Sequence, residues 1–267
     1  MLALALEFAC IYLVILVFGY IVPAGQLYVR YHLLRKPEDE ARRIQLRRPT
    51  SEQTWREIRF SLLSIAIFAV MGTALFELWR AGRTGLYTHL HDYPLWYLPV
   101  SFALSLFLFD TYFYWLHRFM HLRPVFPYTH WGHHRSVSPT PWAIYSFQPA
   151  EAILQFVGIM LLVVFLPMHL VVFWAFLSFD TLVNTAGHTG YEIIPQALSR
   201  LPLLRTFNTV THHDAHHTNT RVNFGVFFNI WDRWMGTFSE GTPKALTREQ
   251  NESGASAAVN VSVGAPE

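Results

Sequence analysis

The sequence predicts an all-α integral membrane protein, with about four membrane spans and a histidine-rich helical cap. The 267-residue chain is 52% hydrophobic and only 14% charged, whereas about a quarter of the residues of a soluble domain are charged. Its apolar residues gather in four long stretches, and 11 of its 14 histidines lie between positions 117 and 217. A soluble protein of this size would need more charged residues on its surface. The apolar stretches are therefore expected to contact lipid.

The first three apolar stretches are each expected to cross the membrane once. Residues 2–22 carry a single charge at Glu7, and residues 60–76 and 93–109 carry none. A helix needs about 20 apolar residues to cross the hydrocarbon core. The first stretch lacks the basic start and the small-residue cleavage site of a signal peptide, so it is expected to be a retained helix.

The fourth stretch predicts a helical hairpin. Residues 152–179 form an uncharged run of 28, which is too long for one span. Pro167 interrupts this run, and proline ends or kinks a helix because it lacks the backbone N–H. Two short helices folded back at Pro167 are therefore expected.

Loop charges predict the orientation of the spans. Residues 30–59 hold nine Lys and Arg side chains, whereas residues 81–92 hold only Arg83. The positive-inside rule places the first loop in the cytoplasm. Counting spans from there places every histidine cluster on the cytoplasmic face. The net charge of +2 gives no reason to expect a nucleic-acid partner.

Three regions are expected along the chain. Residues 1–92 would form the N-terminal transmembrane helices and the basic loop, and residues 93–246 a second domain that contains the histidine clusters. Residues 247–267 have no periodicity and few large apolar residues, so a disordered tail is expected there.

The histidines recur in spacings typical of metal sites. The segment HRFMH (117–121) places two histidines four apart, on one helix face, and HWGHH (130–134) and HDAHH (213–217) share a second spacing. The single Cys10 leaves no thiolate cluster, so a metal here would be held by nitrogen and oxygen. One zinc ion takes about four ligands, so nine or ten imidazoles favour two metals with open, catalytic positions. The predicted ligands are His117, His121, His130, His133, His134, His188, His213, His216 and His217.

Two carboxylates are predicted to orient these ligands. Asp110 shares a helical face with His117, and Asp180, Asn184 and His188 are spaced by four. A ligating imidazole usually donates its second N–H to a carboxylate or carbonyl oxygen. The alternative is that both acids mark helix ends near water. The remaining histidines are expected to lie outside the site, in loops (His32, His89 and His91) and at the hairpin turn (His169).

The order of these motifs resembles the fatty acid hydroxylase/sterol desaturase superfamily of integral-membrane di-iron oxygenases, nearest its sterol C-5 desaturase-like branch. The resemblance covers roughly residues 95–240. Besides the histidines it includes DTYFYWLHRFMH (110–121), PTPWAIYSFQPAEAILQ (139–155) and NFGVFFNIWDRWMGTF (223–238).

The resemblance implies a membrane-bound oxidoreductase with two iron ions and O₂ as co-substrate. It would hydroxylate or desaturate an unactivated C–H bond of a lipid, with a sterol-like substrate favoured. No catalytic side chain is expected apart from the metal centre, and zinc could replace iron in a purified sample. The electrons would come from a separate b-type cytochrome, or from a ferredoxin with its reductase, because the chain has no Rossmann glycine motif, flavin signature or haem domain.

One position departs from the family pattern. Hydroxylases of the superfamily can carry a second histidine four residues before the late one, where this chain has Asn184. The tenth ligand is therefore open among Asn184, a water molecule and His212.

Other functions remain possible from the sequence. A hydroxylase of fatty acyl, ether-lipid or carotenoid substrates would share the same motifs. A membrane metal-binding or transport protein would need ionisable residues along its spans, and these spans contain almost none. A zinc-dependent membrane hydrolase would need a general base such as the Glu of HExxH, which is missing here.

Overall fold

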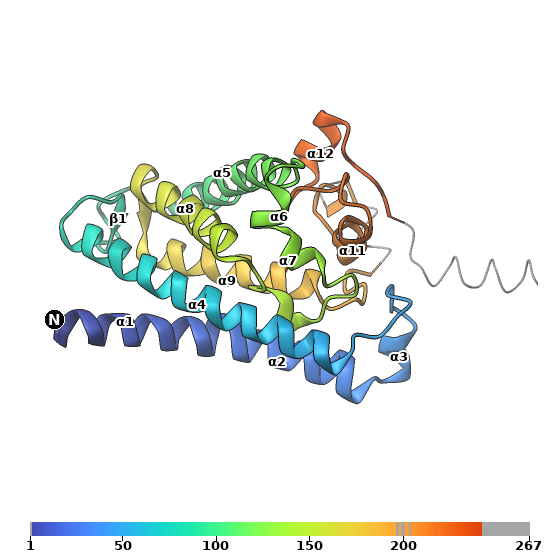
Figure 1. Cartoon of the computed structure of the whole chain (residues 1–267). Coiled ribbons are helices and arrows are strands. Elements are labelled where there is room, and N and C mark those ends of the chain that lie inside the picture. Colours follow the sequence, from blue (N-terminus) through green and yellow to red (C-terminus); the bar gives the residue numbers. More distant parts are fainter. Residues whose placement is uncertain (1, 196–197, 199–200, 203, 242–267) are drawn as a thin grey trace, which may run out of the picture.

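A computed structural model describes residues 2–195, 198, 201–202 and 204–241 and is mostly helical (Figure 1). The predicted all-α fold is confirmed for these residues, among which only two short strands occur. The predicted tail at 247–267 lies outside the described residues. The elements are α1 (Leu2–Val14), η1 (Ile15–Ile21), α2 (Val22–Tyr28), η2 (Val29–Leu34), α3 (Pro37–Glu40), α4 (Ser51–Arg80), β1 (Leu86–Tyr87), α5 (Tyr97–Met120), α6 (Phe126–Thr129), α7 (Trp131–His134), η3 (Pro141–Ala143), α8 (Pro149–Phe165), β2 (Met168–His169), α9 (Leu170–Gly187), η4 (Leu204–Thr206), α11 (Val210–Thr218) and α12 (Ile230–Met235).

The N-terminal helix is longer than its apolar stretch suggests. Four segments, α1, η1, α2 and η2, follow one another without a break and give 33 helical residues, Leu2–Leu34. Pro23 does not end this helix, because the wider π-helical turns of η1 immediately precede it and accommodate a residue that lacks an N–H. His32, expected in a loop, therefore lies in the last helical turns. Arg35 ends the helix in the left-handed conformation, with φ of 48°.

Among the described residues, three helices are long and apolar enough to cross a membrane: Leu2–Leu34, Ser51–Arg80 and Leu170–Gly187. The predicted hairpin is present, since α8 and α9 are separate helices on either side of Pro167. Of these two, α8 is the shorter apolar helix. The helix predicted from residues 93–109 is α5, which has 24 residues and is not among the three. Its apolar run is interrupted by Asp110 and several tyrosines.

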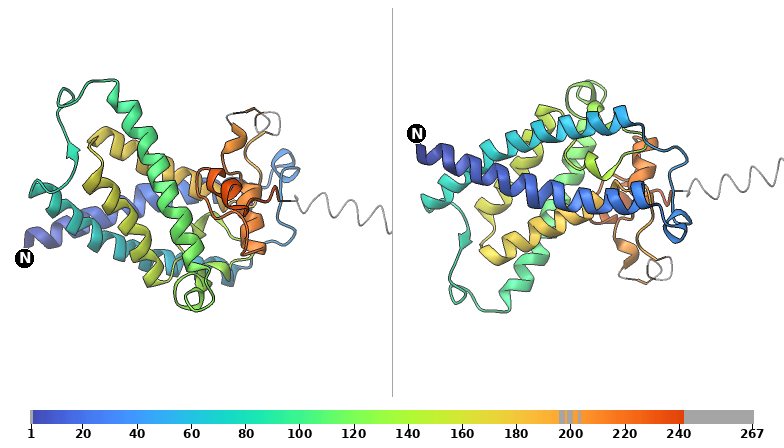
Figure 2. Two further views of the ribbon diagram at one scale, coloured as in Figure 1. Left: turned by 90° about the horizontal axis from the view of Figure 1, so that it is seen from above. Right: turned by 90° about the horizontal axis from the view of Figure 1, so that it is seen from below.

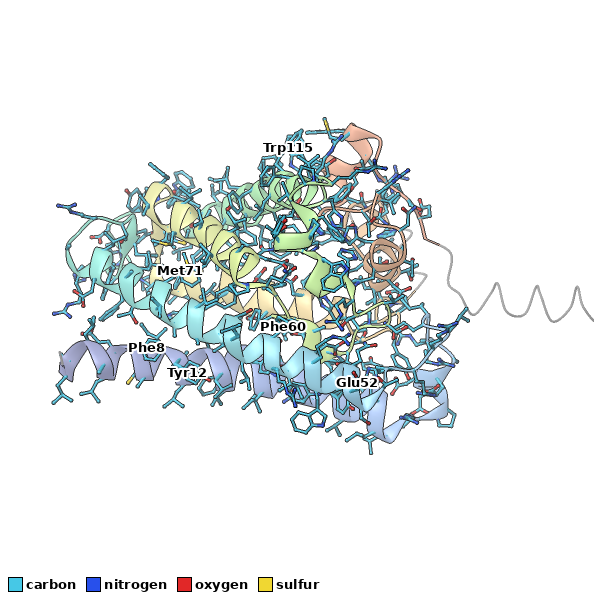
Figure 3. The ribbon with its side chains drawn as sticks, in the orientation of Figure 1. Phe8, Tyr12, Glu52, Phe60, Met71 and Trp115 are labelled. Carbon is cyan, nitrogen blue, oxygen red and sulfur yellow. The ribbon has the colours of Figure 1, made fainter. Side chains whose placement is uncertain are left out.

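The long helices pack into a stem, and apolar side chains are exposed on its outer surface. Helices α1 and α4 run side by side, and α5 crosses the α8–α9 hairpin on the other side (Figure 2). No side chain of α1 is buried in the protein, and Leu2 of α1 and Phe18 of η1 are 77% and 71% exposed. Figure 3 shows Phe8 and Tyr12 of α1 along this stem beside α4, which carries Phe60 and Met71. Large apolar side chains exposed along a stem are those expected of a surface in contact with lipid.

Every histidine motif lies at the end of the stem away from the N-terminus. Figure 1 shows α3, α7 and α11 gathered at this end, whereas β1 lies near the opposite end. The strands β1 and β2 pair in parallel, Leu86 with Met168 and Tyr87 with His169. His169 thus belongs to the hairpin turn, where its Nδ1 accepts the N–H of Val171 and caps α9.

Close packing of α5 against α8 depends on Gly158. A Cβ atom at this position would lie 2.5 Å from the ring of Tyr112, whose hydroxyl donates to the carbonyl oxygen of Leu154 at 2.7 Å. The ring cannot move away without losing this bond. Gly158→Ala is therefore expected to destabilise the fold by about 1–3 kcal/mol. Thermal unfolding in detergent measures the loss. Gly19→Ala, where the nearest atoms lie at an ordinary 3.6 Å, is the matched control, and equal stability of the two variants would contradict this account.

Candidate metal centre

Four parts of the fold carry the nine predicted ligands. The last turn of α5 and the residue after it supply His117 and His121, the α6–α7 segment supplies three more, and α9 ends at His188. The other three come from α11, which Thr209 starts as a capping box with His212. Seven of the nine side chains are buried, and His121 and His213 are partly buried.

The nine histidines form two groups. One group of five contains His117, His121, His130, His134 and His216, and one group of four contains His133, His188, His213 and His217. In each group the ligand-capable atoms all lie within 4.8 Å of one another. Each HxxHH motif is divided between the groups. Neighbouring residues on a helix point about 100° apart, whereas residues four apart share a face. His130 and His134 therefore stay together and His133 points to the other group.

Imidazole nitrogens face one another across both groups. In the group of five, Nε2 of His117 lies 2.9 Å from Nε2 of His130, and His134 and His216 approach to 3.0 Å. In the group of four, the separations are 3.1 to 3.3 Å. Ligands held at about 2.0–2.1 Å from one ion stand roughly 3 Å from each other. The separations therefore match the edges of a coordination shell.

Hydrogen bonds on the far side of four rings fix which nitrogen is free. The Nδ1 atoms of His117, His188 and His216 donate to the carbonyl oxygens of Phe224, Asn184 and Val222 at 2.7 to 2.8 Å. Carbonyl oxygens only accept, so Nδ1 carries the proton and Nε2 of the neutral ring carries a lone pair. These lone pairs point into the two groups.

Glu151, at the start of α8, gives His130 the same tautomer when its carboxyl group is ionised. Its Oε1 lies 2.6 Å from Nδ1 of His130, with the two side chains 0% and 3% exposed. The lone pairs of His117 and His130 then face each other at 2.9 Å, which is repulsive unless a cation lies between them. Burial lowers the pKa of His130 well below its usual value, so the ring stays neutral. The donor set thus fits a metal ion, whose charge would also balance the buried carboxylate.

Glu151 was not singled out from the sequence. It stands at the border of the uncharged run 152–179 and inside one of the family-like segments. A carboxylate at the beginning of an otherwise apolar helix was the available signal, since a charge in that position needs a partner.

Asp110 supports the site by binding a backbone segment, and its hydrogen bonds do not go to a histidine ring. Its Oδ1 accepts the backbone N–H groups of Val226, Phe227 and Phe228 at 2.7 to 3.2 Å. Asp232, which sequence reasoning did not select, accepts the N–H groups of Phe224 and Gly225. The two carboxylates thereby hold the segment whose Phe224 carbonyl orients His117.

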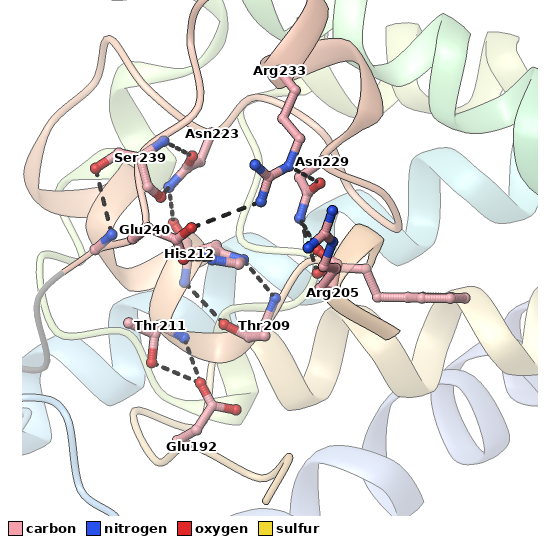
Figure 4. Close-up of polar contacts among 12 residues, drawn as sticks. Glu192, Arg205, Thr209, Thr211, His212, Asn223, Asn229, Arg233, Ser239 and Glu240 are labelled. Atoms are coloured by element: carbon pink, nitrogen blue, oxygen red, sulfur yellow. Dashed lines mark hydrogen bonds and ion pairs between the residues drawn. The ribbon is translucent and has the colours of Figure 1, made fainter. Parts of the chain in front are cut away.

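Asn184 and His212, the two side chains open as a tenth ligand, both make hydrogen bonds within the protein. The side-chain amide of Asn184 donates to Asp180 Oδ1 at 2.9 Å, so Asp180 is linked to His188 only through Asn184. His212 lies outside both groups. Its Nδ1 accepts the N–H of Thr209 at 3.1 Å, and its backbone N–H donates to the Thr209 hydroxyl, so it caps α11 (Figure 4).

A cavity of about 830 Å³ leads from the histidines into the stem. Five of the nine histidines line it, together with apolar side chains of the N-terminal helix, α4, α8 and α9. Small-molecule sites have volumes of roughly 300–1,000 Å³ and mainly apolar walls. The cavity therefore offers room for an apolar molecule that reaches both groups. Three of the histidines that line the cavity lie outside the long stem helices. Burial lowers the pKa values of these three far below the usual range, namely those of His130, His133 and His213.

Comparison with known proteins gives a consistent set of matches. A family model described as fatty acid hydroxylase matches residues 102–237. Lathosterol oxidase of Homo sapiens is 32% identical over 188 residues, which are 70% of this chain and 61% of that protein. The Delta(7)-sterol 5(6)-desaturase erg31 of Schizosaccharomyces pombe is 30% identical over 186 residues, 70% of this chain and 59% of that protein.

Methylsterol monooxygenase 1 of Rattus norvegicus is 30% identical over 145 residues, 54% of this chain and 48% of that protein. The chain thus spans about 61% of the length of the lathosterol oxidases it matches. No solved structure matches the chain.

Proposed function

Because the chain belongs to the fatty acid hydroxylase family, we propose that it is a membrane-bound, iron-dependent oxidoreductase that uses O₂ to hydroxylate or desaturate a sterol-like lipid. The observation that carries the proposal is the cavity whose walls are apolar along the stem and imidazole at the end. The names of the relatives, which are sterol desaturases, oxidases and monooxygenases, support a sterol-like substrate.

The two histidine groups would hold one iron ion each. Bound iron would supply the O₂-dependent oxidation of an aliphatic C–H bond, because no amino-acid side chain can carry out this oxidation. The chain's own residues have three tasks. The carbonyl and carboxylate acceptors keep Nε2 of His117, His130, His188 and His216 unprotonated. Burial excludes water from the imidazoles, and the stem positions the lipid.

The substrate would enter from the bilayer. Side chains of the N-terminal helix and of α9, such as Phe18 and Leu182, line the cavity and are largely exposed on the stem. A lipid can therefore pass from the membrane to the histidines without crossing water.

The reducing equivalents would come from a separate b-type cytochrome or ferredoxin. The histidine end would face the cytoplasm, because the positive-inside rule places the basic residues 30–59 there.

The proposal predicts an O₂-dependent sterol product in membranes that contain the protein. Membranes are supplied with a reductant and with sterol or fatty acyl substrates, and products are identified by mass spectrometry. The expected result is a mass change of one added oxygen atom, or of two hydrogens lost, in a sterol only. Product confined to fatty acyl lipids would move the assignment to a fatty acyl hydroxylase. Bound metal with no O₂ uptake on any lipid would instead favour a metal-binding or transport protein.

A further inference from the structure

We propose that Asp180, with Asn184, Thr181 and Tyr145, forms a polar subsite in the cavity that binds the hydroxyl group of a free sterol beside the four-histidine group. The inference rests on the proposed function and deepens it, because it states which end of the substrate lies at the metal centre. The polar end would be held inside, and the hydrocarbon tail would extend along the stem.

The four side chains line the cavity together. Asp180 Oδ1 accepts one hydrogen bond, from the amide of Asn184 at 2.9 Å. The hydroxyls of Tyr145 and Thr181 lie 3.4 Å apart. They extend the polar patch from α9 to the segment that precedes α8. The patch thus combines a carboxylate acceptor with two hydroxyl groups that can donate or accept.

Asp180 has no cationic partner in the described part of the chain, since none of the ion pairs found there includes it. It stands in α9, one of the helices able to span a membrane. A carboxyl group in an apolar, membrane-embedded cavity is costly unless it is hydrogen-bonded. The hydroxyl group of a bound ligand would supply the missing partner.

The order of side chains along α9 sets the orientation of the ligand. From the histidine end, the cavity-lining residues along α9 are His188, Asn184, Leu182, Thr181, Asp180, Ser178, Leu177, Trp174, Phe173 and Leu170. Eight helical residues, from Asp180 to His188, rise by about 12 Å. Apart from Leu182, the lining residues from His188 to Ser178 are polar, and those beyond Ser178 are apolar.

This arrangement fits a free sterol better than a fatty acyl lipid. A sterol has one hydroxyl group on a terminal ring and is otherwise hydrocarbon, so its ring carbons near the hydroxyl would lie nearest the histidines. A fatty acyl ester has no O–H to donate to Asp180, and neither has the carboxylate of a free fatty acid. The subsite thus selects an alcohol.

The test compares binding of a Δ7-sterol with that of its 3-deoxy analogue. Both compete with the fluorescent sterol dehydroergosterol on metal-loaded protein in lipid nanodiscs. Asp180→Leu is expected to weaken binding of the free sterol by roughly 10- to 100-fold, the worth of a hydrogen bond to a charged group, and to leave the 3-deoxy analogue within about twofold. Asp180→Asn, which keeps one acceptor oxygen, should give an intermediate loss.

Ser178→Ala is the matched control, because Ser178 lines the same cavity on the same helix and has no assigned role. It should change neither affinity. An equal loss for both ligands in Asp180→Leu, or a loss for neither, would overturn the subsite. Binding of the 3-deoxy analogue also reports that the variant is folded.

Turnover by the wild-type protein separates this inference from the proposed function. If the free sterol binds through Asp180 but is never oxidised, the subsite stands and the proposed function fails. If the sterol is oxidised without any dependence of binding on the hydroxyl group, the function stands and the subsite fails.

Discussion

Replacing His133 with alanine is expected to remove one of two bound metal ions and to lower reductant-dependent O₂ uptake by at least about 100-fold. His133 belongs to the group of four, where its Nε2 lies 3.3 Å from that of His188. The variant leaves three imidazoles in that group and all five in the other. Metal content, measured by mass spectrometry on protein purified without added metal, should fall from about two ions per chain to about one.

The neighbouring residue provides the complementary variant. His134 belongs to the group of five, so His134→Ala should also remove one ion, and the His133→Ala/His134→Ala double variant both. His91→Ala, an exposed histidine of the loop before α5, is the control and should retain both ions and full O₂ uptake. His212→Ala should keep both ions as well, and lose only the hydrogen bond from the Thr209 N–H to the His212 ring, worth about 1 kcal/mol.

Two results would contradict this division. Loss of all metal in either single variant would mean that the nine histidines form one site. Unchanged metal content in both would mean that these residues are not ligands. Zinc found in place of iron would leave the division intact, because imidazole binds zinc as well.

Replacing Glu151 with leucine is expected to weaken metal binding in the group of five by about 10- to 100-fold and to lower O₂ uptake by a similar factor. The carboxylate accepts the Nδ1 proton of His130 at 2.6 Å. Without it, His130 is free to place its proton on Nε2 and cannot then bind a metal ion. Titration of the apoprotein with Fe²⁺ or Co²⁺ measures the change in affinity.

Two further variants test whether Glu151 acts by orienting the His130 ring, by its charge, or only by stabilising the fold. Glu151→Gln keeps an acceptor oxygen and removes the charge, so it should recover part of the affinity. Glu57→Leu is the matched control, since Glu57 is also 0% exposed but bonds to Thr140 and Gln53. It should lower stability and leave the metal affinity of the folded protein unchanged. If Glu57→Leu and Glu151→Leu lose metal equally, Glu151 has only a structural role.

Much of this architecture follows from local patterns in the sequence. The uncharged runs predict the apolar helices, because lipid-facing backbone must satisfy its own hydrogen bonds. Pro167 predicts the break between α8 and α9, which the structure contains. The length of the first helix did not follow, because π-helical turns carry it through Pro23, and such turns have no sequence signature of their own.

The candidate site divides in the same way. The i, i+4 spacings determined which histidines share a helix face, and the order of the motifs determined the family. The sequence gives the spacing within HWGHH and HDAHH, but it could not say which other side chains each histidine faces. The structure splits both, and places His216 with His130 and His134 but His217 with His133. It also brings Glu151 to His130, 21 residues away, and turns Asp110 toward a backbone segment more than 100 residues later.

By itself, therefore, the sequence determined the apolar helices and the break at Pro167, and it predicted the nine histidines that the structure brings together. Tertiary structure alone decided which histidines face each other and which acids support them. The physical reason is the range of the interactions. Helical periodicity and hydropathy act over a few residues, whereas the two groups form only where α5, α7, α9 and α11 pack at one end of the stem.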